Sequence, residues 1–427
     1  MSHFTVLTLG SRGDVAPFLA LGAGLVGAGH RVRLITFQDF GGEARVQGLD
    51  FHPIRGEMRG LLSGPSGMRL VDSGASVVRM SSSLQRMFKR LGDGIAEDLS
   101  SPKLLDTDLI VNQLPGALFG ADLAERAGVP MVMAAVMPLA PTRLDPMLAF
   151  PSWPSIIPGY NLTTHWLAYQ IAWQMMRPAI NRWRVRGLGL KPLPRLGIWR
   201  TLQREKVPVL NAYSPHLSPP PADWGDHIHV TGAWFEDDRD WKAPEDLARF
   251  IELGRAPVYI GFGSMPIRDP RGTLQRIIEA VGRIGRRAVL QTGWSGIERD
   301  GLPENVFLAG AVPHSWLFPR MAAVVHHGGS GTTAAGVRAG IPSILAPFVF
   351  DQFFWGRRIA RLGVGPEPIP HRWLTANRLA DAITVSVSSQ PMRERAAALG
   401  KRVREEKGVQ GAIRLLQEYA ERSAPKV

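Results

Sequence analysis

The stretch HHGGSGTT, residues 326–333, indicates the fold of this chain more clearly than any other part of it. The apolar run Ala322–Val325 before it predicts a buried strand, and TTAAGVRAG after it predicts a helix that ends at Gly340. Glycines at such a junction let backbone N–H groups approach an anion, and a helix N-terminus carries a partial positive charge. The junction therefore predicts a phosphate-sized anion site, although an ordinary strand-to-helix turn could have the same residues.

The next apolar run supports the anion site. IPSILAPF, residues 341–348, predicts another strand, and Asp351 and Gln352 follow its C-terminal end. Ligands of open α/β sheets bind outside the carboxyl ends of the strands. We therefore expect these two polar side chains to lie beside the glycine-rich loop.

Apolar runs and helix-compatible segments alternate along the whole chain. FTVLTL (residues 4–9), a GSRGD loop, a helical segment and RVRLITF (residues 31–37) form one βαβ pattern, and the order recurs from DLIVNQ (residues 108–113). A second set begins at APVYIGFGSM (residues 256–265). This alternation predicts α/β domains with parallel sheets.

With 427 residues, the chain is too long for one ordinary core, so two domains are expected. Proline-rich and acidic segments between residues 213 and 240 indicate the connection. The predicted boundaries are an N-terminal Rossmann-like domain, a linker, a C-terminal Rossmann-like domain, and a terminal helix with a basic tail that packs back toward the N-terminal domain, at residues 1–215, 216–240, 241–390 and 391–427.

Composition excludes several classes of protein. A hydrophobic fraction of 45% with 20% charged residues is typical of a folded globular chain. There are no cysteines, which excludes disulfides and thiolate metal sites and fits a cytoplasmic enzyme. The opening residues MSHFTVLTLGSRGD have no basic region before their apolar run, so we expect a first strand there and not a targeting signal.

The net charge of +13 predicts attraction to polyanions. No nucleic-acid-binding motif accompanies the scattered arginines, so nucleic acid is not expected as a partner. An anionic substrate, or peripheral contact with an anionic membrane, fits the charge better.

The segment His165–Arg186 is rich in Trp, Met and Arg at helical spacing, with Trp166, Trp173 and Trp183 prominent. Such a face is most often core. The alternatives are the wall of an apolar acceptor pocket and a membrane-facing surface.

One acidic pair deserves a test as a metal site. Asp238-Arg239-Asp240 has the Asp-x-Asp spacing that can chelate a divalent ion on a nucleotide diphosphate. Paired carboxylates in a polar linker are usually solvated, and no apolar strand precedes these. No metal ligand and no cofactor are therefore predicted.

Taken together, these motifs resemble the inverting UDP-glycosyltransferases of GT-B architecture, in which two Rossmann-like domains face each other across a cleft. Within that group the chain is most similar to sterol glucosyltransferases and to bacterial enzymes that glycosylate antibiotics. The resemblance rests on GSRGDVAPFLALGAGLVGAGH, VYIGFGSM, LGVGPEPI and the long segment around HHGGSGTT, residues 310–359. It covers nearly the whole chain in the same order.

The resemblance implies a role for each residue of a donor site. His326 would contact the phosphates, the glycine-rich loop would hold the diphosphate, and Ser264 beside Gly263 would close over it. Asp351 and Gln352 would bind sugar hydroxyls. The base would lie against the remaining positions, so that the predicted donor site comprises Gly263, Ser264, Trp294, Val312, His314, His326, Gly328, Gly329, Ser330, Gly331, Thr332, Asp351 and Gln352.

The resemblance also implies a catalytic base at Asp14, where many relatives carry histidine. An ordinary aspartate is ionised at neutral pH and can accept a proton late in the attack of an alcohol on an oxocarbenium-like sugar. The alternative is that Asp14 caps the following helix. Arg12 could pair with Asp14 or meet the donor, and it is assigned no catalytic role.

The expected activity is transfer of a hexose, most simply glucose, from a UDP-sugar to a hydroxyl of a lipophilic acceptor such as a sterol, triterpenoid or polyketide. A dTDP-sugar donor and a lipid-chain acceptor are the closest alternatives. A sugar-nucleotide epimerase would convert the donor with no acceptor. A non-catalytic nucleotide- or lipid-binding protein would leave it intact.

Overall fold

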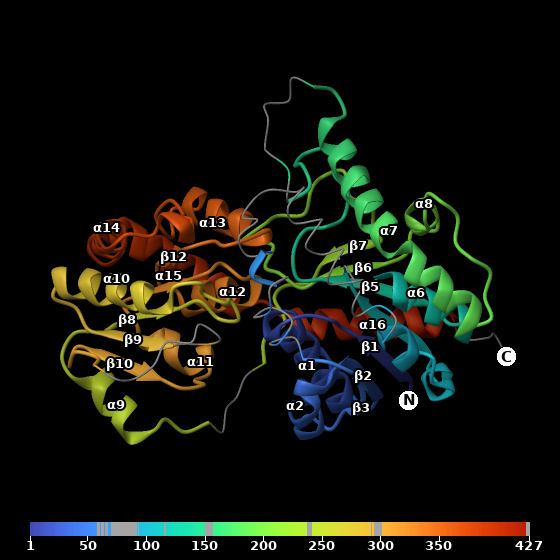
Figure 1. Ribbon diagram of the computed structural model, residues 1–427, viewed down its shortest axis with the longest axis horizontal. Helices are drawn as coiled ribbons and strands as arrows, with labels where there is room; N and C mark the ends of the chain where they lie inside the picture. Colours follow the sequence, from blue (N-terminus) through green and yellow to red (C-terminus); the bar gives the residue numbers. More distant parts are fainter. Residues whose placement is uncertain are drawn as a thin grey trace.

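The computed structural model describes residues 1–57, 94–114, 117–148, 157–236, 241–291 and 301–423, with a few isolated positions between these ranges. Its strands form two parallel sheets, one of seven strands and one of five. Figure 1 shows the sheets in two separate bodies, with α12 and α13 at the boundary between them. This is the predicted pair of doubly wound domains.

The first sheet has the strand order β3-β2-β1-β4-β5-β6-β7. β1, β4 and β5 are buried along their whole length, as expected for parallel strands covered on both faces. The strands are β1 His3–Leu7, β2 Arg31–Phe37, β3 Asp50–Ile54, β4 Leu109–Gln113, β5 Met131–Ala135, β6 Val209–Asn211 and β7 Ile228–Val230.

The second sheet has the order β10-β9-β8-β11-β12. Its strands are β8 Val258–Gly261, β9 Ala288–Gln291, β10 Val306–Ala309, β11 Ala323–His326 and β12 Ser343–Leu345. In both sheets the strand order reverses beside the first strand, between β1 and β4 and between β8 and β11. Such reversal points open crevices at the carboxyl ends of the strands, where ligands bind.

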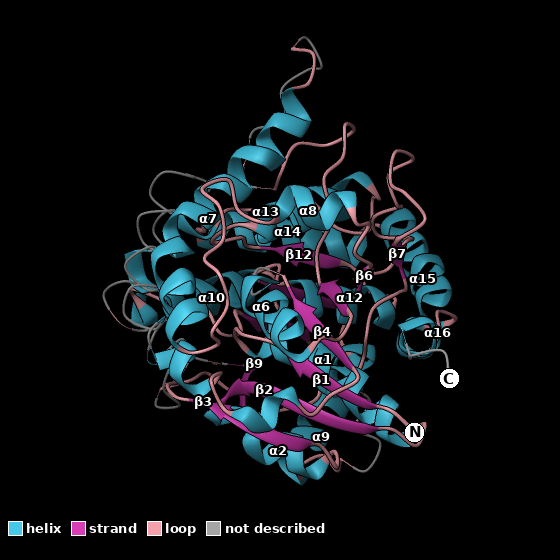
Figure 2. Cartoon of the chain, turned by 90° about the vertical axis from the view of Figure 1, so that its right-hand side faces the viewer, coloured by secondary structure: helices cyan, strands magenta, loops and turns pink. Residues whose placement is uncertain are grey.

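The helices surround these sheets on both sides (Figure 2). Their ends follow local sequence, since Asp269 caps α10 through Gly272 N–H, Thr375 caps α14 through Arg378 N–H, and Gly340 ends α12 at a φ of 76°. The helices are α1 Arg12–Gly27, α2 Gly41–Val46, α6 Ala117–Ala127, α7 Tyr160–Arg186, α8 Trp199–Arg204, α9 Glu245–Glu252, α10 Pro270–Arg283, α11 His314–Leu317, α12 Ser330–Ala339, α13 Asp351–Arg361, α14 Ala376–Ser388, α15 Gln390–Arg404 and α16 Gly408–Ser423.

The C-terminal helix returns to the first body. Figure 1 shows α16 beside α1 and β1, far from the second sheet. Gln417 Nε2 lies 2.9 Å from His30 Nε2, and Tyr419 OH lies 2.9 Å from His229 Nε2. The side chains of Val409 and Ile413 pack against Gly24 of α1, where a Cβ would come within 2.8 Å of both.

The segment 216–240, expected from sequence to be a linker, contains β7, the seventh strand of the first sheet. The first sheet therefore continues beyond residue 215. Its hydrogen-bonding partner β6 comes immediately before the proline-rich run, which connects two neighbouring strands and not two domains. Proline-rich composition marks a break in regular structure, and such a break also occurs within a domain.

Candidate functional site

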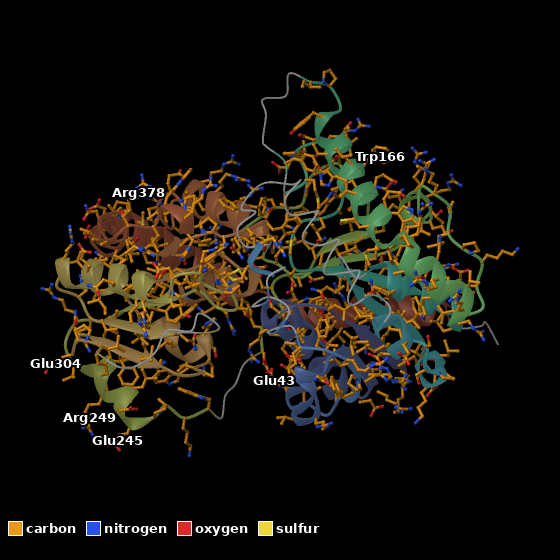
Figure 3. The ribbon with its side chains drawn as sticks, viewed as in Figure 1. Glu43, Trp166, Glu245, Arg249, Glu304 and Arg378 are labelled. Atoms are coloured by element: carbon orange, nitrogen blue, oxygen red, sulfur yellow. The ribbon has the colours of Figure 1, made fainter. Side chains whose placement is uncertain are left out.

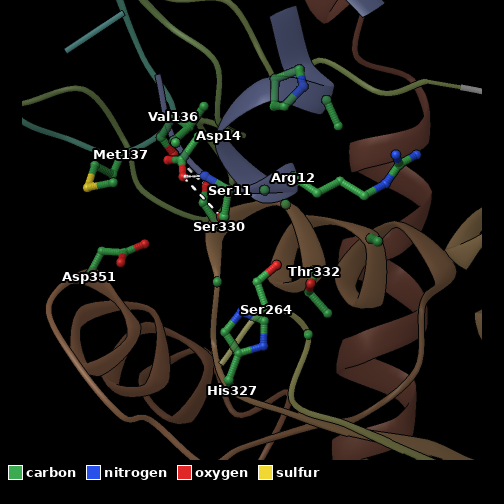
Figure 4. Close-up of a pocket in the computed structure, with 18 of the residues that line it drawn as sticks. Ser11, Arg12, Asp14, Val136, Met137, Ser264, His327, Ser330, Thr332 and Asp351 are labelled. Atoms are coloured by element: carbon green, nitrogen blue, oxygen red, sulfur yellow. Dashed lines mark hydrogen bonds between the residues drawn. The ribbon is translucent and has the colours of Figure 1, made fainter. Parts of the chain in front are cut away.

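Asp14 lies at the first reversal point, where β1 runs into α1. Ser11 is the N-cap residue of this helix, and Asp14 occupies its third position. The Ser11 N–H and hydroxyl donate to Asp14 Oδ2 at 2.9 and 3.1 Å (Figure 4). Asp14 therefore closes a capping box from within the first turn, which corrects the alternative that it is itself the N-cap.

The other carboxylate oxygen of Asp14 faces the neighbouring strand β4. Gln113 ends this strand, and its Nε2 donates to Asp14 Oδ1 at 3.4 Å. The Oε1 of Gln113 accepts from the Thr8 hydroxyl at 2.6 Å and from the Leu9 N–H at 2.9 Å. These two donors fix the orientation of the amide, so that its N–H₂ group points at Asp14.

Sequence reasoning missed Gln113. The signal was the polar pair Asn112-Gln113 at the carboxyl end of a strand whose other residues are apolar, because ligands of parallel sheets bind at that edge. Burial raises the pKa of the Asp14 carboxyl, while the hydrogen bonds from Ser11 and Gln113 lower it and offset part of that rise. Asp14 is thus a stronger base than an exposed aspartate.

The second reversal point, between β8 and β11, lies on the other side of an interdomain cavity from Asp14. β8 leads to Gly263 and Ser264, and β11 leads to His327 and to α12, which begins at Ser330. Gly263 has a φ of 58°, and a Cβ at this position would meet His327. The glycine is therefore needed for the turn that brings Ser264 to the cavity.

His327, and not His326, lines the cavity between the domains. Successive residues of a strand point to opposite faces, so two adjacent histidines cannot both face the ligand side. His326 is fully buried on β11, and its Nδ1 accepts the Gly328 N–H at 3.0 Å. The sequence predicts the phosphate contact at His326, whereas the structure places the ring of the next residue, His327, at the cavity.

Both histidines are electrically neutral. Burial lowers the pKa of His327 to about 4 and holds the pKa of His326 well below its usual range. The His326 ring is fully buried, and its Nε2 has no hydrogen-bond partner within the described part of the chain. His327 can offer a neutral N–H donor to an anion without a desolvated positive charge.

The glycine-rich loop ends at the N-terminus of α12. Gly329, Ser330, Gly331 and Thr332 line the cavity, whereas Gly328, at a φ of 92°, packs behind them against Leu345 and Gln352. The Ser330 hydroxyl donates to the Val136 carbonyl of the first domain. The loop is therefore joined to the opposite domain by a hydrogen bond, while the hydroxyl of Thr332 faces the cavity beside Ser264 (Figure 4).

Asp351 and Gln352 line the cavity at the start of α13. Phe350, just before them, has a φ of 51° and ψ of −121°, a strained conformation for a residue with a side chain. The Trp355 indole N–H donates to Asp351 Oδ2 at 3.2 Å. Burial, and secondly the negative charge of Asp14, raise the pKa of Asp351 to about 7.

The Gln352 side chain is already engaged by its own loop. Its Oε1 accepts from the N–H groups of Phe348 and Val349 at 2.8 and 3.2 Å, and its Nε2 faces the Met265 sulfur at 3.3 Å. Gln352 therefore holds the turn that presents Asp351. Both members of the predicted acidic-amide pair line the cavity, but the amide of Gln352 is occupied by the loop.

A third region of the cavity contains Val312 and His314, where the resemblance places the base of the nucleotide. The His314 ring stacks on Phe318 with centroids 4.2 Å apart, and burial lowers its pKa to about 4, helped by the charge of Arg12. Trp316 and Trp241 lie nearby with ring centroids 5.1 Å apart. The predicted wall residue Trp294 falls outside the described residues, as does the Asp238-Arg239-Asp240 triplet.

Arg12 does not pair with Asp14. Its guanidinium hydrogen-bonds to Glu43 and lies 3.7 Å from Glu236. Both partners border the cavity. The guanidinium also lies close enough to His314 for its charge to help lower the pKa of that ring.

The cavity has a volume of about 2480 Å³ and joins both domains. On the first domain it is mainly apolar, and helix α7 contributes a regular stripe at positions 168, 171, 172, 175 and 176. Residues three and four apart share one helix face, so the stripe is a continuous wall. Its members are Ala168, Ile171, Ala172, Met175 and Met176.

The three prominent tryptophans of α7 lie in different environments. Trp173 and Trp183 are buried in the core, as the more common interpretation expects, and Trp166 is exposed. Tyr169 also lines the cavity, with its ring stacked on Trp199 at 4.4 Å and its hydroxyl donating to the Leu139 carbonyl at 2.6 Å. An apolar wall therefore lines this side of the cavity, and Ile171 and the methionines form it, not the tryptophans.

Two family models match the chain. The N-terminal domain of glycosyltransferase family 28 matches residues 4–106, and the C-terminal domain described as erythromycin biosynthesis protein CIII-like matches residues 275–410. A sterol 3-beta-glucosyltransferase of Candida albicans is 36% identical over 96% of this chain, and another of Arabidopsis thaliana is also 36% identical over 96%. The chain belongs to the GT-B glycosyltransferases.

Solved structures support the same fold. The glycosyltransferase of kitacinnamycin is similar at a TM-score of 0.67 and 19% identity, with 98% of this chain and 99% of that chain covered. The calicheamicin glycosyltransferase is similar at 0.65 and 17% identity, with 100% of both chains covered. The GT-B architecture expected from sequence is confirmed over the whole length.

The chain spans only part of the length of the relatives that it matches. The alignment covers 27% of the Candida albicans protein and 66% of the Arabidopsis thaliana protein. Among the described helices, none is long and apolar enough to cross a membrane. The described residues also contain no group of three or more His, Cys, Asp and Glu side chains that could hold a metal ion.

Proposed function

We propose that this protein transfers glucose from UDP-glucose to a hydroxyl group of a sterol or a similar lipophilic acceptor, with inversion at the anomeric carbon. The single observation that carries the proposal is the set of residues that line the interdomain cavity. One wall combines a half-buried carboxylate, Asp14, with an apolar stripe on α7. The other wall combines His327 with the N-terminus of α12.

The second-domain wall suits a nucleotide diphosphate. Backbone N–H groups at the start of α12, the neutral His327 ring and the hydroxyls of Ser264 and Thr332 offer hydrogen-bond donors without charged side chains. The partial positive charge of the helix N-terminus favours the negative leaving group. In this arrangement the base lies against Val312 and His314, and no metal ion is needed to stabilise the diphosphate.

Asp14 accepts the proton in the proposed reaction. The acceptor oxygen forms a bond to the anomeric carbon while the bond from that carbon to the diphosphate oxygen breaks, and UDP leaves with the electron pair. The acceptor hydroxyl becomes acidic as it attacks, so a carboxylate with a raised pKa can take its proton. Asp351, on the opposite wall, accepts hydrogen bonds from sugar hydroxyls.

The acceptor class follows from the apolar wall and from the relatives. A rigid, fused-ring alcohol buries its hydrocarbon surface against Ile171, Met175 and Met176 and directs its hydroxyl toward Asp14. The two relatives compared above carry the name sterol 3-beta-glucosyltransferase. The name supports a sterol 3-hydroxyl as the acceptor and glucose as the sugar.

The direct test is UDP release from UDP-glucose with a panel of sterols, triterpenoids and polyketides, and the same panel with dTDP-glucose. We expect release with UDP-glucose that depends on the acceptor, together with a glucosylated product. Conversion of UDP-glucose without any acceptor would support an epimerase instead. Tight UDP binding with an intact sugar under all conditions would support a non-catalytic binding protein.

A further inference from the structure

Exposed large apolar side chains gather at one end of the molecule. Of the eleven such residues in the described part of the chain, four lie at the N-terminal end of α7 or on segments joined to it. We call this group the apolar tip: Leu144, Ile157, Trp166 and Leu167, which are 59, 50, 44 and 39% exposed.

Hydrogen bonds hold the apolar tip together. Asn161 Nδ2 donates to the Arg143 carbonyl at 2.8 Å, and His165 Nε2 lies 3.2 Å from the Asp145 carbonyl, so the residues on both sides of Leu144 are fixed to α7. Ile157 is tied to the helix start through the Tyr160 N–H at 3.2 Å. The tip is therefore a built surface, not a single protruding side chain.

The tip also projects. Figures 1 and 2 show the N-terminal turns of α7 rising beyond the rest of the protein, and Figure 3 shows Trp166 on this part of the helix. No other segment described by the structure packs over Trp166 or Leu167 enough to bury them. An amphipathic surface with exposed tryptophan and leucine is typical of contact with the interface of a bilayer.

Arginines surround the tip. Arg143 is next to Leu144 and is exposed. Arg357 and Arg361 of α13 line a small crevice together with Asp145, Pro146 and Leu148 of the tip loop. Burial, and secondly the charge of Arg361, lower the pKa of Arg357, while the charge of Asp145 offsets part of the effect. This part of the surface therefore favours an anionic partner.

The tip is continuous with the acceptor cavity. Trp166 and Leu167 are followed at once on α7 by Ala168, the first residue of the apolar stripe. Phe150 lines both the crevice beside the arginines and the main cavity. A lipophilic acceptor dissolved in a membrane would thus meet apolar surface from the tip to the site.

We propose that the apolar tip and its arginines dock the protein on an anionic lipid bilayer, so that α7 leads the acceptor from the membrane into the cavity. The inference rests on the proposed function for the identity of the acceptor. The docking itself concerns a separate surface: neither Trp166 nor Leu167 lines the cavity, and neither do Arg357 and Arg361.

The test is flotation of the full chain with phosphatidylcholine vesicles, prepared with and without phosphatidylglycerol. Two variants remove the two parts of the surface, W166S/L167S and R357Q/R361Q. We expect the first to lower the partition coefficient on both kinds of vesicle by about tenfold. The second should lower it by about tenfold on the anionic vesicles alone.

Matched controls come from the second domain. Trp373 is 52% exposed there, and Arg378 and Arg393 are exposed on α14 and α15. Figure 3 shows Arg378 at the opposite end of the molecule from Trp166. The variants W373S and R378Q/R393Q should partition like the wild-type protein. Equal losses in these controls would show general surface adhesion and would overturn the proposal.

Enzymatic readouts separate docking from catalysis. With a detergent-dispersed acceptor, W166S/L167S should keep the wild-type rate, whereas with acceptor held in vesicles its rate should fall. The docking proposal would be overturned if both tip variants partitioned onto vesicles like the wild-type protein. It would also be overturned if W166S/L167S changed the protein between monomer and dimer, because the tip would then be a contact between copies of the chain. A docking protein that turns over no acceptor would refute the proposed function alone.

Discussion

Asp14 and Asp351 face one cavity from opposite domains, and the negative charge of Asp14 contributes to raising the pKa of Asp351 to about 7 (Figure 4). Two carboxylates in one desolvated space cannot both ionise freely. Each is held by its own partners, Ser11 and Gln113 on one side and Trp355 on the other. The two carboxylates therefore mark the two sides of the cavity, Asp14 on the first domain and Asp351 on the second.

Replacement of Asp14 by asparagine removes the proposed base and keeps the shape of the side chain. We expect kcat to fall by about 10²–10⁴-fold while the dissociation constant of UDP stays unchanged. Steady-state kinetics and calorimetric titration with UDP measure the two quantities. A variant with the wild-type kcat would contradict the role of Asp14.

Removal of the Gln113 amide should move the pH dependence. The hydrogen bond from Gln113 lowers the pKa of Asp14, so in Q113A the acid limb of the kcat profile should shift to higher pH. In Q113E a carboxylate faces Asp14, and the shift should be larger. A purely structural role for Gln113 would lower stability in both variants and leave the pH profile in place.

Asp351 should reduce stability in the absence of donor. Its folded pKa of about 7 lies above its unfolded value of 3.8, so the folded state resists ionisation as the pH rises between these values. We expect D351N to raise the free energy of unfolding at pH 8 by about 1–3 kcal/mol and to leave it unchanged near pH 3. Urea unfolding at the two pH values measures this, and equal effects at both would contradict it.

Substitutions of the two adjacent histidines should have different effects on UDP binding and on stability. H327A removes a donor from the proposed phosphate site and should weaken UDP binding by about 10- to 100-fold. H326N keeps an acceptor for the Gly328 N–H but leaves space in the core, so it should lower the melting temperature with little change in UDP affinity. Reversed effects on UDP affinity would restore His326 as the phosphate ligand.

Treatment with EDTA should leave the reaction rate unchanged. In the proposed site the diphosphate is bound by the start of α12, His327 and hydroxyl groups, which already supply donors and partial positive charge. Rates measured before and after chelation, and again with added Mg²⁺, provide the comparison. Loss of activity that Mg²⁺ restores would require a metal in the mechanism.

The two domains and their parallel sheets could be predicted because buried parallel strands produce apolar runs that alternate with helices. The choice between His326 and His327 could not be predicted, because it depends on the exact residue at which β11 ends. Adjacent residues of a strand point to opposite faces of the sheet, so an error of one residue selects the wrong side chain. Gln113 was missed because its partner Asp14 is 99 positions away. The segment of α7 could be predicted to have an apolar face, but which residues face the core and which face the cavity could not, since Trp173 is buried in the core while Met175 and Met176 line the cavity.

The return of α16 to the first domain means that the chain crosses between the domains twice. The two crossings touch, since a Cβ on Gly408 would meet the Ala233 carbonyl, and the second crossing also contacts the loop after β6, where the Ser214 hydroxyl donates to Glu406. A chimera that exchanges one half of this protein for that of a relative must therefore be joined at two places. With a single junction near residue 240, the C-terminal helix of the relative would take the place of α16 against α1, and its side chains would not match that surface.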